Sequence, residues 1–151
     1  MRHLKMAMMA LLLQGLLFPM AGNATEMQTD LKISEVFQRY GRQRNVTMVE
    51  LSNEMLETYN LTYYKSIVIK NNREALQFIR QCLEVDQKGA KKIKEVTENG
   101  QVVSSYYQLP GTQPNLNRFI LFKVDTKGEI TLVYIEGEVD SDDLITILFN
   151  K

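Results

Sequence analysis

Apolar residues follow a helical period in four parts of the chain. Spacings of three and four residues between apolar side chains predict amphipathic helices. Gly41 is a typical stop for the first helix, and Ser52 is a typical N-cap for the second. The four predicted helices cover 30–40, 53–57, 71–85 and 141–149.

Other stretches are rich in β-branched and aromatic residues, which is typical of strands. Two of them are single short runs, 45–51 and 66–70. A third, over 93–109, carries Asn99 and Gly100 between two strand-like arms. An Asn-Gly pair favours the tight turn of a β-hairpin, so this stretch is predicted to be one.

A second predicted hairpin joins 117–124 to 129–139. The residues between the arms suit a type I turn that ends on a glycine in the left-handed conformation. This turn places Arg118 opposite Glu136, which predicts a cross-strand ion pair. The second arm is apolar on both faces, so it is expected at the centre of the sheet. Its residues predicted to be buried are Leu132, Val133 and Ile135.

These elements predict a single α+β domain with a mainly antiparallel sheet of about five strands and with helices packed on one face. Because a helix separates the first two strands, parallel pairing between those two is left open. The domain is expected to cover 25–151, a length that suits one hydrophobic core.

Residues 1–24 have the pattern of a secretory signal peptide. A cationic start precedes an apolar run over 6–18, and Gly22 and Ala24 suit cleavage before Thr25. The apolar run is shorter than the roughly twenty residues that span a bilayer. The mature protein is therefore expected to be periplasmic or extracellular, without stable membrane insertion. An uncleaved segment that acts as a membrane anchor is the alternative.

Cleavage would also change the charge balance and the available chemistry. The chain has 18 basic and 18 acidic residues, and the loss of Arg2 and Lys5 leaves a small negative net charge. Such a balance gives no attraction to nucleic acid. The one histidine, His3, would be lost as well. Serine or cysteine triads, histidine zinc sites and haem attachment are thereby excluded, and no cofactor or metal is expected.

Cys82 is the single cysteine, so the domain has to fold without an internal disulfide. Helical spacing puts Cys82 on the apolar side of the predicted helix 71–85. A buried small hydrophobic residue is the favoured interpretation. A disulfide between two chains is the alternative.

An acid-rich stretch, GEITLVYIEGEVDSDDL over 128–144, leads from the last strand into the last helix. Asp140 or Ser141 at the N-cap, followed by carboxylates in the first turn, is typical of a helix start. Calcium binding and paired-carboxylate catalysis are the alternatives. A catalytic role would use some of the acids Glu136, Glu138 and Asp140.

The stretches IKEVTENGQVVSSYYQL and EITLVYIEGEVDSDDLITIL resemble the C-terminal half of a group of small exported domains of unknown function from Gram-negative anaerobic bacteria of the Bacteroides type. VFQRYGRQRNVTMVELSNEML is similar to the first helix, the first strand and the serine-led helix of that group. The resemblance covers nearly all of 31–149. It implies an α+β fold and a location in the cell envelope, and it implies no catalytic residue.

Two features are candidate binding surfaces. Adjacent tyrosines in a strand point to opposite faces, so one of each pair is expected to be exposed and able to bind a sugar or a protein. A lysine-rich run over 88–95 could contact anionic lipid headgroups or an acidic partner. Strand propensity and the stabilisation of a helix C-terminus are the plainer explanations. The candidate binding residues are Tyr63, Tyr64, Tyr106, Tyr107, Lys91 and Lys92.

The favoured function is a non-catalytic module of the cell envelope that binds a protein or a glycan through a sheet face or edge. The alternative is a carboxylate-based enzyme that acts on glycans.

Overall fold

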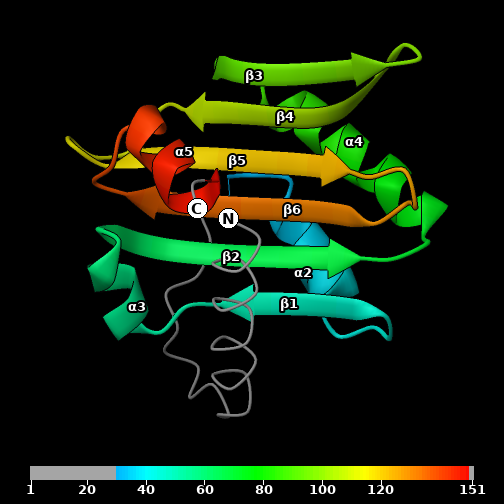
Figure 1. The fold of residues 1–151 in the computed structure, drawn as a ribbon, viewed down its shortest axis with the longest axis horizontal. Coiled ribbons are helices and arrows are strands. Elements are labelled where there is room, and N and C mark those ends of the chain that lie inside the picture. The colour runs from blue at the N-terminus through cyan, green and yellow to red at the C-terminus, as the bar shows by residue number, and fades with distance from the viewer. Residues whose placement is uncertain (1–29, 150–151) are drawn as a thin grey trace.

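The computed structural model describes residues 30–149, which form a six-stranded antiparallel sheet with four helices (Figure 1). The predicted signal peptide lies outside the described residues. Along the sheet the strand order is β1-β2-β6-β5-β4-β3. The strands are β1 (Val46–Glu50), β2 (Leu61–Ile69), β3 (Lys91–Glu98), β4 (Gln101–Leu109), β5 (Asn117–Val124) and β6 (Ile130–Gly137). The helices are α2 (Ser34–Tyr40), α3 (Asn53–Thr58), α4 (Arg73–Asp86) and α5 (Ser141–Phe149).

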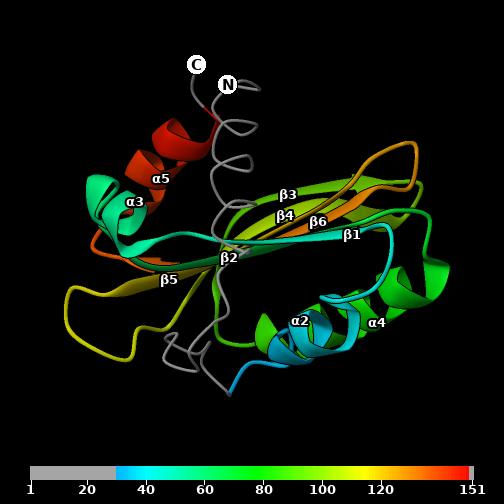
Figure 2. The ribbon, with the colours of Figure 1, turned by 90° about the horizontal axis from the view of Figure 1, so that it is seen from below.

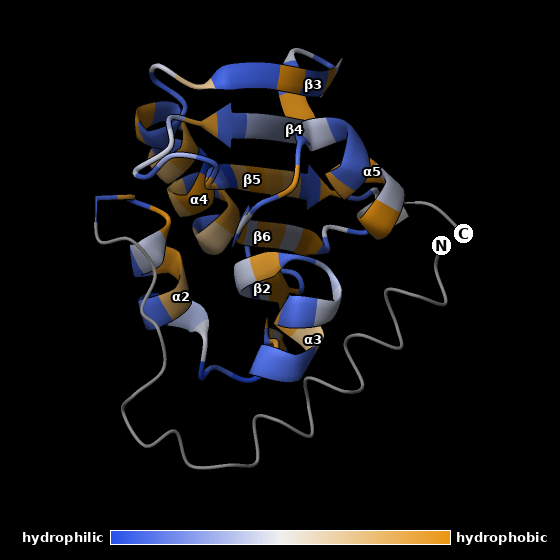
Figure 3. Ribbon diagram, turned by 90° about the vertical axis from the view of Figure 1, so that its left-hand side faces the viewer, coloured by the Kyte–Doolittle hydropathy of each residue, from blue (hydrophilic) through white to orange (hydrophobic). Residues whose placement is uncertain are grey.

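The sheet carries helices on both faces. Figure 2 shows α2 and α4 on one side and α3 with α5 on the other. The α+β class and the antiparallel sheet are confirmed, whereas the prediction that the helices share one face is wrong. The reason lies in β5 and β6, which are mostly hydrophobic (Figure 3) and present apolar side chains to both sides. A sheet that is apolar on both faces needs a cover on each of them.

Two hydrophobic clusters result, one on each face of the sheet. The α2/α4 side holds the larger cluster, in which Ile67, Ile79, Ile120 and Leu132 are fully buried. On the α3/α5 side the cluster is built around these residues: Val49, Phe119, Val133, Ile135 and Leu144. The predicted burial of Leu132, Val133 and Ile135 is confirmed, and it divides between the two clusters.

The first two strands pair antiparallel, so the parallel option is wrong. Their connection contains only the six-residue helix α3, and β2 starts already at Leu61. Asn60, with φ +58°, makes the turn into β2. A parallel crossover needs a dozen or more residues, and the chain between β1 and β2 is shorter than that.

Both hairpins form as predicted. Asn99 and Gly100 have φ values of +52° and +79°, as a type I′ turn requires, and Glu98 pairs with Gln101. In the second hairpin the Gly128 amide donates to the Asp125 carbonyl at 3.1 Å, and Gly128 has φ +83°. The two turns are settled by local residue chemistry.

Gly41 ends α2 for a different reason from the one expected. Its φ is −61°, which any residue can adopt. A Cβ at this position would lie 2.5 Å from the Phe37 carbonyl oxygen and 2.7 Å from Met48 Sδ. Glycine is therefore needed here because the Phe37 carbonyl of the helix and the Met48 side chain of β1 leave no room for a Cβ.

The start of α2 is capped from a distant part of the chain. The buried Asp86, at the end of α4, accepts hydrogen bonds from the amides of Lys32 at 2.7 Å and Ile33 at 2.9 Å. Cys82 lies buried one helical turn before Asp86, as predicted. Burial, together with the Asp86 and Glu35 carboxylates, raises the pKa of the Cys82 thiol to about 11.

Asp86→Ala is expected to lower the free energy of unfolding by about 1–3 kcal/mol, because two backbone N–H groups lose their acceptor. Asp86→Asn should cost less, since its amide oxygen still accepts one of the two bonds. Urea denaturation of the three proteins at neutral pH measures the difference. Equal stability of the wild type and Asp86→Ala would contradict this cap.

The same residue should give a pH dependence. Burial raises the pKa of Asp86 above 3.8, although its two amide hydrogen bonds oppose the rise. The folded state then binds this proton at a higher pH than the unfolded state does. The stability advantage over Asp86→Asn should therefore grow as the pH falls towards 3.8, and should shrink as the pH rises through the folded pKa. Denaturation of both proteins between neutral and acidic pH tests the sign.

Candidate binding cleft

A cleft of about 390 Å³ lies between α4 and the β3–β4 hairpin on the α2/α4 side of the sheet. One wall is a single face of α4, on which the lining residues follow the spacing i, i+3, i+4, i+7. The other wall comes from β3 and β4, with one residue of β5. The helix wall is Arg80, Leu83, Glu84 and Gln87, and the sheet wall is Lys92, Glu95, Gln101, Val102, Ser105, Tyr107 and Phe122.

Local chemistry fixes the two walls. Asn72 caps α4 by accepting a hydrogen bond from the Ala75 amide at 2.9 Å. The helix buries Ala75, Ile79 and Leu83 against the sheet, and its next face meets the hairpin. On β4, alternate residues point the same way, so Ser105 and Tyr107 share a face.

A hydrogen-bonded chain runs along the sheet wall. Lys92 Nζ lies 3.0 Å from Glu95 Oε1. The Tyr107 hydroxyl faces two acceptors, Glu95 Oε2 at 3.2 Å and Gln87 Oε1 at 2.9 Å. Burial raises the pKa of Tyr107, the nearby Ser105 hydroxyl opposes the rise, and the Glu95 carboxylate adds to it. The phenol therefore stays protonated, and the Glu95 charge is balanced by Lys92.

Arg80 has no such balance. Its guanidinium donates to two neutral acceptors, Gln101 Oε1 at 3.1 Å and the Val102 carbonyl at 2.9 Å. None of the ion pairs in the described part of the chain includes this arginine. Its Nε is buried and has no hydrogen-bond partner. The cleft thus contains a half-buried cation without a bridging carboxylate.

Ser105 supplies a second unpartnered group. The residue is only 3% exposed, and its hydroxyl makes no hydrogen bond of good geometry, although it lies close enough to the Tyr107 hydroxyl to lower the pKa of that phenol. Buried polar groups in folded proteins are nearly always paired, so an unpaired one calls for an explanation. Two such atoms, Ser105 Oγ and Arg80 Nε, belong to residues that line the same cleft.

The structure brings only two of the predicted binding residues into this cleft, Tyr107 and Lys92. Lys91 is exposed on β3, outside the lining. Tyr63 is buried in the core on the α2/α4 side, and Tyr64 packs half-buried on the opposite face.

Tyr106 and Tyr107 are both buried, so the expectation that one of them is exposed is wrong. Alternation does send their side chains to opposite faces. Each face is covered at this point: Tyr107 contacts α4, and Tyr106 donates to the Ser141 carbonyl of α5 at 3.1 Å. A one-sided sheet would have left one tyrosine in solvent.

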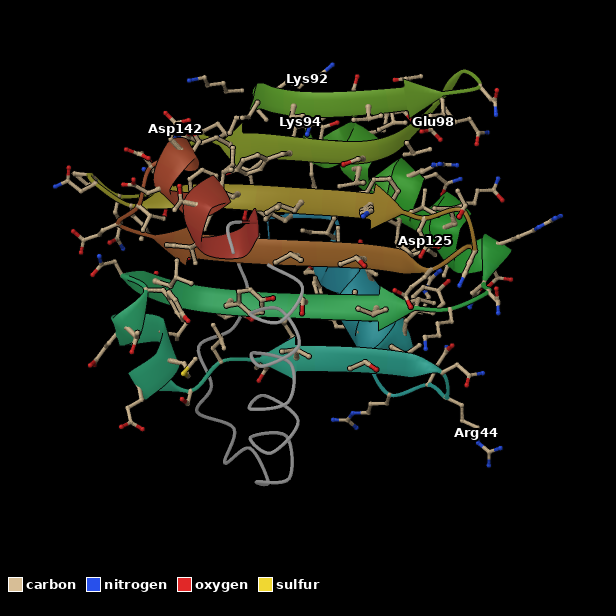
Figure 4. All side chains as sticks on the ribbon, in the orientation of Figure 1. Arg44, Lys92, Lys94, Glu98, Asp125 and Asp142 are labelled. Carbon is tan, nitrogen blue, oxygen red and sulfur yellow. The ribbon has the colours of Figure 1, made fainter. Side chains whose placement is uncertain are left out.

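Lys91, Lys92 and Lys94 of the lysine run belong to the edge strand β3, whereas Lys88 lies in the turn just after α4, which ends at Asp86. Figure 4 shows Lys92 and Lys94 on this outer strand and Arg44 beside the opposite edge of the sheet. Charged side chains on an edge strand oppose unwanted pairing with another sheet. Two register irregularities in the β3–β4 pairing act in the same direction.

Sequence reasoning missed Arg80, Gln87, Glu95 and Ser105. The one available signal is the polar line Arg80, Glu84, Gln87, at helical spacing next to the buried face of α4. A polar line of this kind usually faces solvent. Only the position of the hairpin beside α4 turns it into the wall of a cleft.

The acid-rich stretch at the end of β6 has structural tasks. Asp140 Oδ1 accepts a hydrogen bond from the Asp143 amide at 2.8 Å, which confirms the predicted cap of α5. Glu136 is buried, and its Oε2 accepts the Tyr134 hydroxyl at 2.5 Å. Glu138 is exposed, and its backbone amide bonds to the Asn60 carbonyl.

Arg118 lies opposite Glu136 in the register, as predicted, but the predicted direct ion pair does not form. Arg118 Nε donates to the Tyr134 hydroxyl at 3.0 Å, which stands between the two charged groups. The ion pair of Arg118 is with Asp30, at 3.2 Å. The cross-strand pairing alone did not predict this arrangement. Tyr134 lies two residues before Glu136 on the same face of β6, and its hydroxyl bonds to both charged side chains.

Asp140→Asn is expected to be nearly neutral for stability, since asparagine caps a helix about as well as aspartate. Asp140→Ala should lower the free energy of unfolding by about 1 kcal/mol. Chemical denaturation of the two variants measures the difference. A large loss for Asp140→Asn would show that the charge of Asp140 has a role beyond the cap.

The comparisons with known proteins give a family without an assigned activity. The family described as "Family of unknown function (DUF6108)" matches residues 20–148. The chain belongs to this family. Neither a curated protein nor a solved structure matches it.

Residues 30–149 lack a membrane-spanning helix and a cluster of metal-binding side chains. None of the helices there is long and apolar enough to cross a bilayer. The same residues contain no group of three or more His, Cys, Asp or Glu side chains that could hold a metal ion.

Proposed function

We propose that this domain is a non-catalytic binding module of the cell envelope and that the cleft between α4 and the β3–β4 hairpin is its ligand site. The proposal rests mainly on the two buried polar atoms, Ser105 Oγ and Arg80 Nε, that lack hydrogen-bond partners beside one cleft. A ligand with acceptor groups would satisfy both once the side chains that cover these two atoms move aside. Pockets with a few convergent polar groups over an apolar floor are typical ligand sites.

The shape and composition of the cleft support recognition of a small polar group. Leu83, Val102 and Phe122 supply the apolar part, and charged or amide side chains stand around it. Its volume is at the lower end of the range for small-molecule sites, which suits one or two sugar units or a short peptide segment.

The signal peptide pattern of residues 1–24 supports the assignment to the envelope. The cationic start, the short apolar run and the small residues at Gly22 and Ala24 form a signal peptide pattern. We expect the protein in the periplasmic or extracellular fraction of its host, beginning at Thr25. Mass spectrometry of the fractionated protein tests this, and an intact Met1 in the cytosol would contradict it.

The binding test uses the purified protein and a panel of envelope glycan fragments and peptides. In ¹⁵N-labelled protein, a true ligand should shift the amide signals of α4 and of the β3–β4 hairpin in a saturable way. Lys92→Gln should weaken this response, whereas Lys70→Gln, on an exposed lysine outside the lining, should not. Saturable shifts confined to other elements, or no shifts with any member of the panel, would overturn the proposal.

The same glycan incubations test the enzyme hypothesis. We expect no change in glycan chain length, because Asp140 caps α5 and Glu136 is hydrogen-bonded within the sheet. Hydrolysis that disappears in Glu138→Gln without a change in melting temperature would favour a carboxylate-based enzyme instead.

A further inference from the structure

We infer that the cleft recognises a singly charged carboxylate of its ligand, held by Arg80 and Ser105. This inference rests on the proposed ligand site and adds the chemical class of the group that binds there. It follows from the charges of the lining residues, from their unused hydrogen-bond donors and from the access to Arg80.

Four charged side chains line the cleft. Lys92 and Glu95 are paired at 3.0 Å, so they contribute no net charge to the cleft. Glu84 is exposed on the helix wall and takes part in none of the ion pairs among the described residues. Glu84 and Arg80 are therefore the two unpaired charges of the lining, and of these only the Arg80 guanidinium is half-buried. One half-buried positive charge suits a carboxylate, and the exposed Glu84 repels a dianion such as phosphate more strongly than it repels a singly charged group.

Arg80 and Ser105 have hydrogen-bond donors that are not fully used. A guanidinium has five N–H donors, and Arg80 uses two of them, towards Gln101 and Val102. Its Nε–H is buried and unpaired, and the Ser105 hydroxyl has only a weak contact with the Tyr107 hydroxyl. The surplus is therefore on the donor side. An ionised carboxylate has only acceptors and can take two donors at once.

A ligand can reach the Arg80 guanidinium if the Gln101 side chain moves away. The Gln101 amide is exposed and covers one side of the Arg80 guanidinium. Its oxygen is a neutral acceptor. Hydrogen bonds to a charged acceptor are roughly twice as strong, so a ligand carboxylate can replace Gln101 at the guanidinium. The Gln101 side chain, on the first residue of β4 after the turn, has room in solvent to move away.

A carboxylate could belong to an acidic sugar or to the C-terminus of a peptide, and the experiment separates the two sources. Galacturonate is compared with methyl galactoside, and N-acetyl-alanyl-alanine with its C-terminal amide. Binding is followed through the amide signals of Val102 and Ser105 in the ¹⁵N-labelled protein. At least one acid should bind about tenfold or more tightly than its neutral counterpart.

Variants assign the effect to the cleft. Arg80→Gln should abolish the preference for the acid, and Arg80→Lys should weaken it, because lysine keeps the charge but loses the planar set of donors. Ser105→Ala should weaken acid binding, whereas Gln101→Ala should leave it unchanged or strengthen it. Arg73→Gln, on an exposed arginine of the same helix, is the matched control. Melting curves establish that each variant is folded.

The outcomes separate the inference from the function on which it rests. Equal binding of an acid and its neutral counterpart in the cleft would overturn the carboxylate assignment and leave the ligand site intact. If none of the four probes shifts the amide signals of Val102 or Ser105, the carboxylate assignment is overturned as well. The wider panel of glycan fragments and peptides then tests whether the cleft binds any ligand. Binding of the acid that persists in Arg80→Gln would also overturn the carboxylate assignment.

Discussion

Val133→Asp is expected to lower the free energy of unfolding by about 3–5 kcal/mol, because it places a carboxylate without a partner inside the sheet. Val133 is 6% exposed on the α3/α5 side of β6, one of the two central strands. Its neighbours in the register are Ser66 on β2 and Leu121 on β5. Neither of these side chains can balance a negative charge.

Thr131→Asp is the matched control. Thr131 lies on the same face of β6, two residues earlier, but it is half-buried and stands opposite Lys123. The new carboxylate can therefore reach solvent and a cation, and its cost should stay below about 1 kcal/mol. Chemical denaturation of both variants gives the comparison. Similar, small losses for both would remove β6 from the centre of the core.

Arg118→Met is expected to cost about 3–5 kcal/mol. Arg118 is 3% exposed and bonds to the Tyr134 hydroxyl, which in turn donates to the buried Glu136. Burial and the hydrogen bond to Glu136 raise the pKa of Tyr134, so the phenol stays neutral and cannot replace the lost cation. The variant therefore leaves the Glu136 carboxylate buried without a positive charge nearby.

A double-mutant cycle tests this explanation. Because the buried carboxylate is the source of the cost, Glu136→Gln in the Arg118→Met background should recover about 1–3 kcal/mol. Asp30 is the other partner of Arg118, and its side chain is 61% exposed. Asp30→Asn should therefore cost less than about 1 kcal/mol. A larger loss for Asp30→Asn than for Arg118→Met would show that the exposed ion pair dominates.

Local residue chemistry was enough to predict a large part of the fold. Asn99 with Gly100, and Gly128 after Asp125, specify their turns through backbone conformations that few other residues adopt. Ser52 and Asp140 specify helix starts because their side chains accept backbone N–H groups a few residues away. Once the second turn was placed, the register of β5 and β6 followed from strand geometry.

The two-sided cover of the sheet was visible in part. Apolar residues on both parities of β6 predicted a central strand, and the same pattern implies helices on both faces. Which helices cover which face depends on the path of the chain after β1, where α3 is too short for a crossover. The burial of both Tyr106 and Tyr107 follows from this two-sided cover, because α5 lies over Tyr106 and the end of α4 lies over Tyr107.

The sequence by itself determined the two hairpin turns, the caps of α3 and α5, the central place of β6 and the burial of Cys82, because each depends on neighbours within a few positions or on a simple periodicity. Only the tertiary structure decided the partner of Arg118, the distant cap that Asp86 provides for α2, and the cleft. These depend on residues far apart in the chain, such as Arg80 and Val102 or Asp86 and Ile33. Their side chains meet only after the helices have packed on the sheet, and no local pattern encodes that meeting.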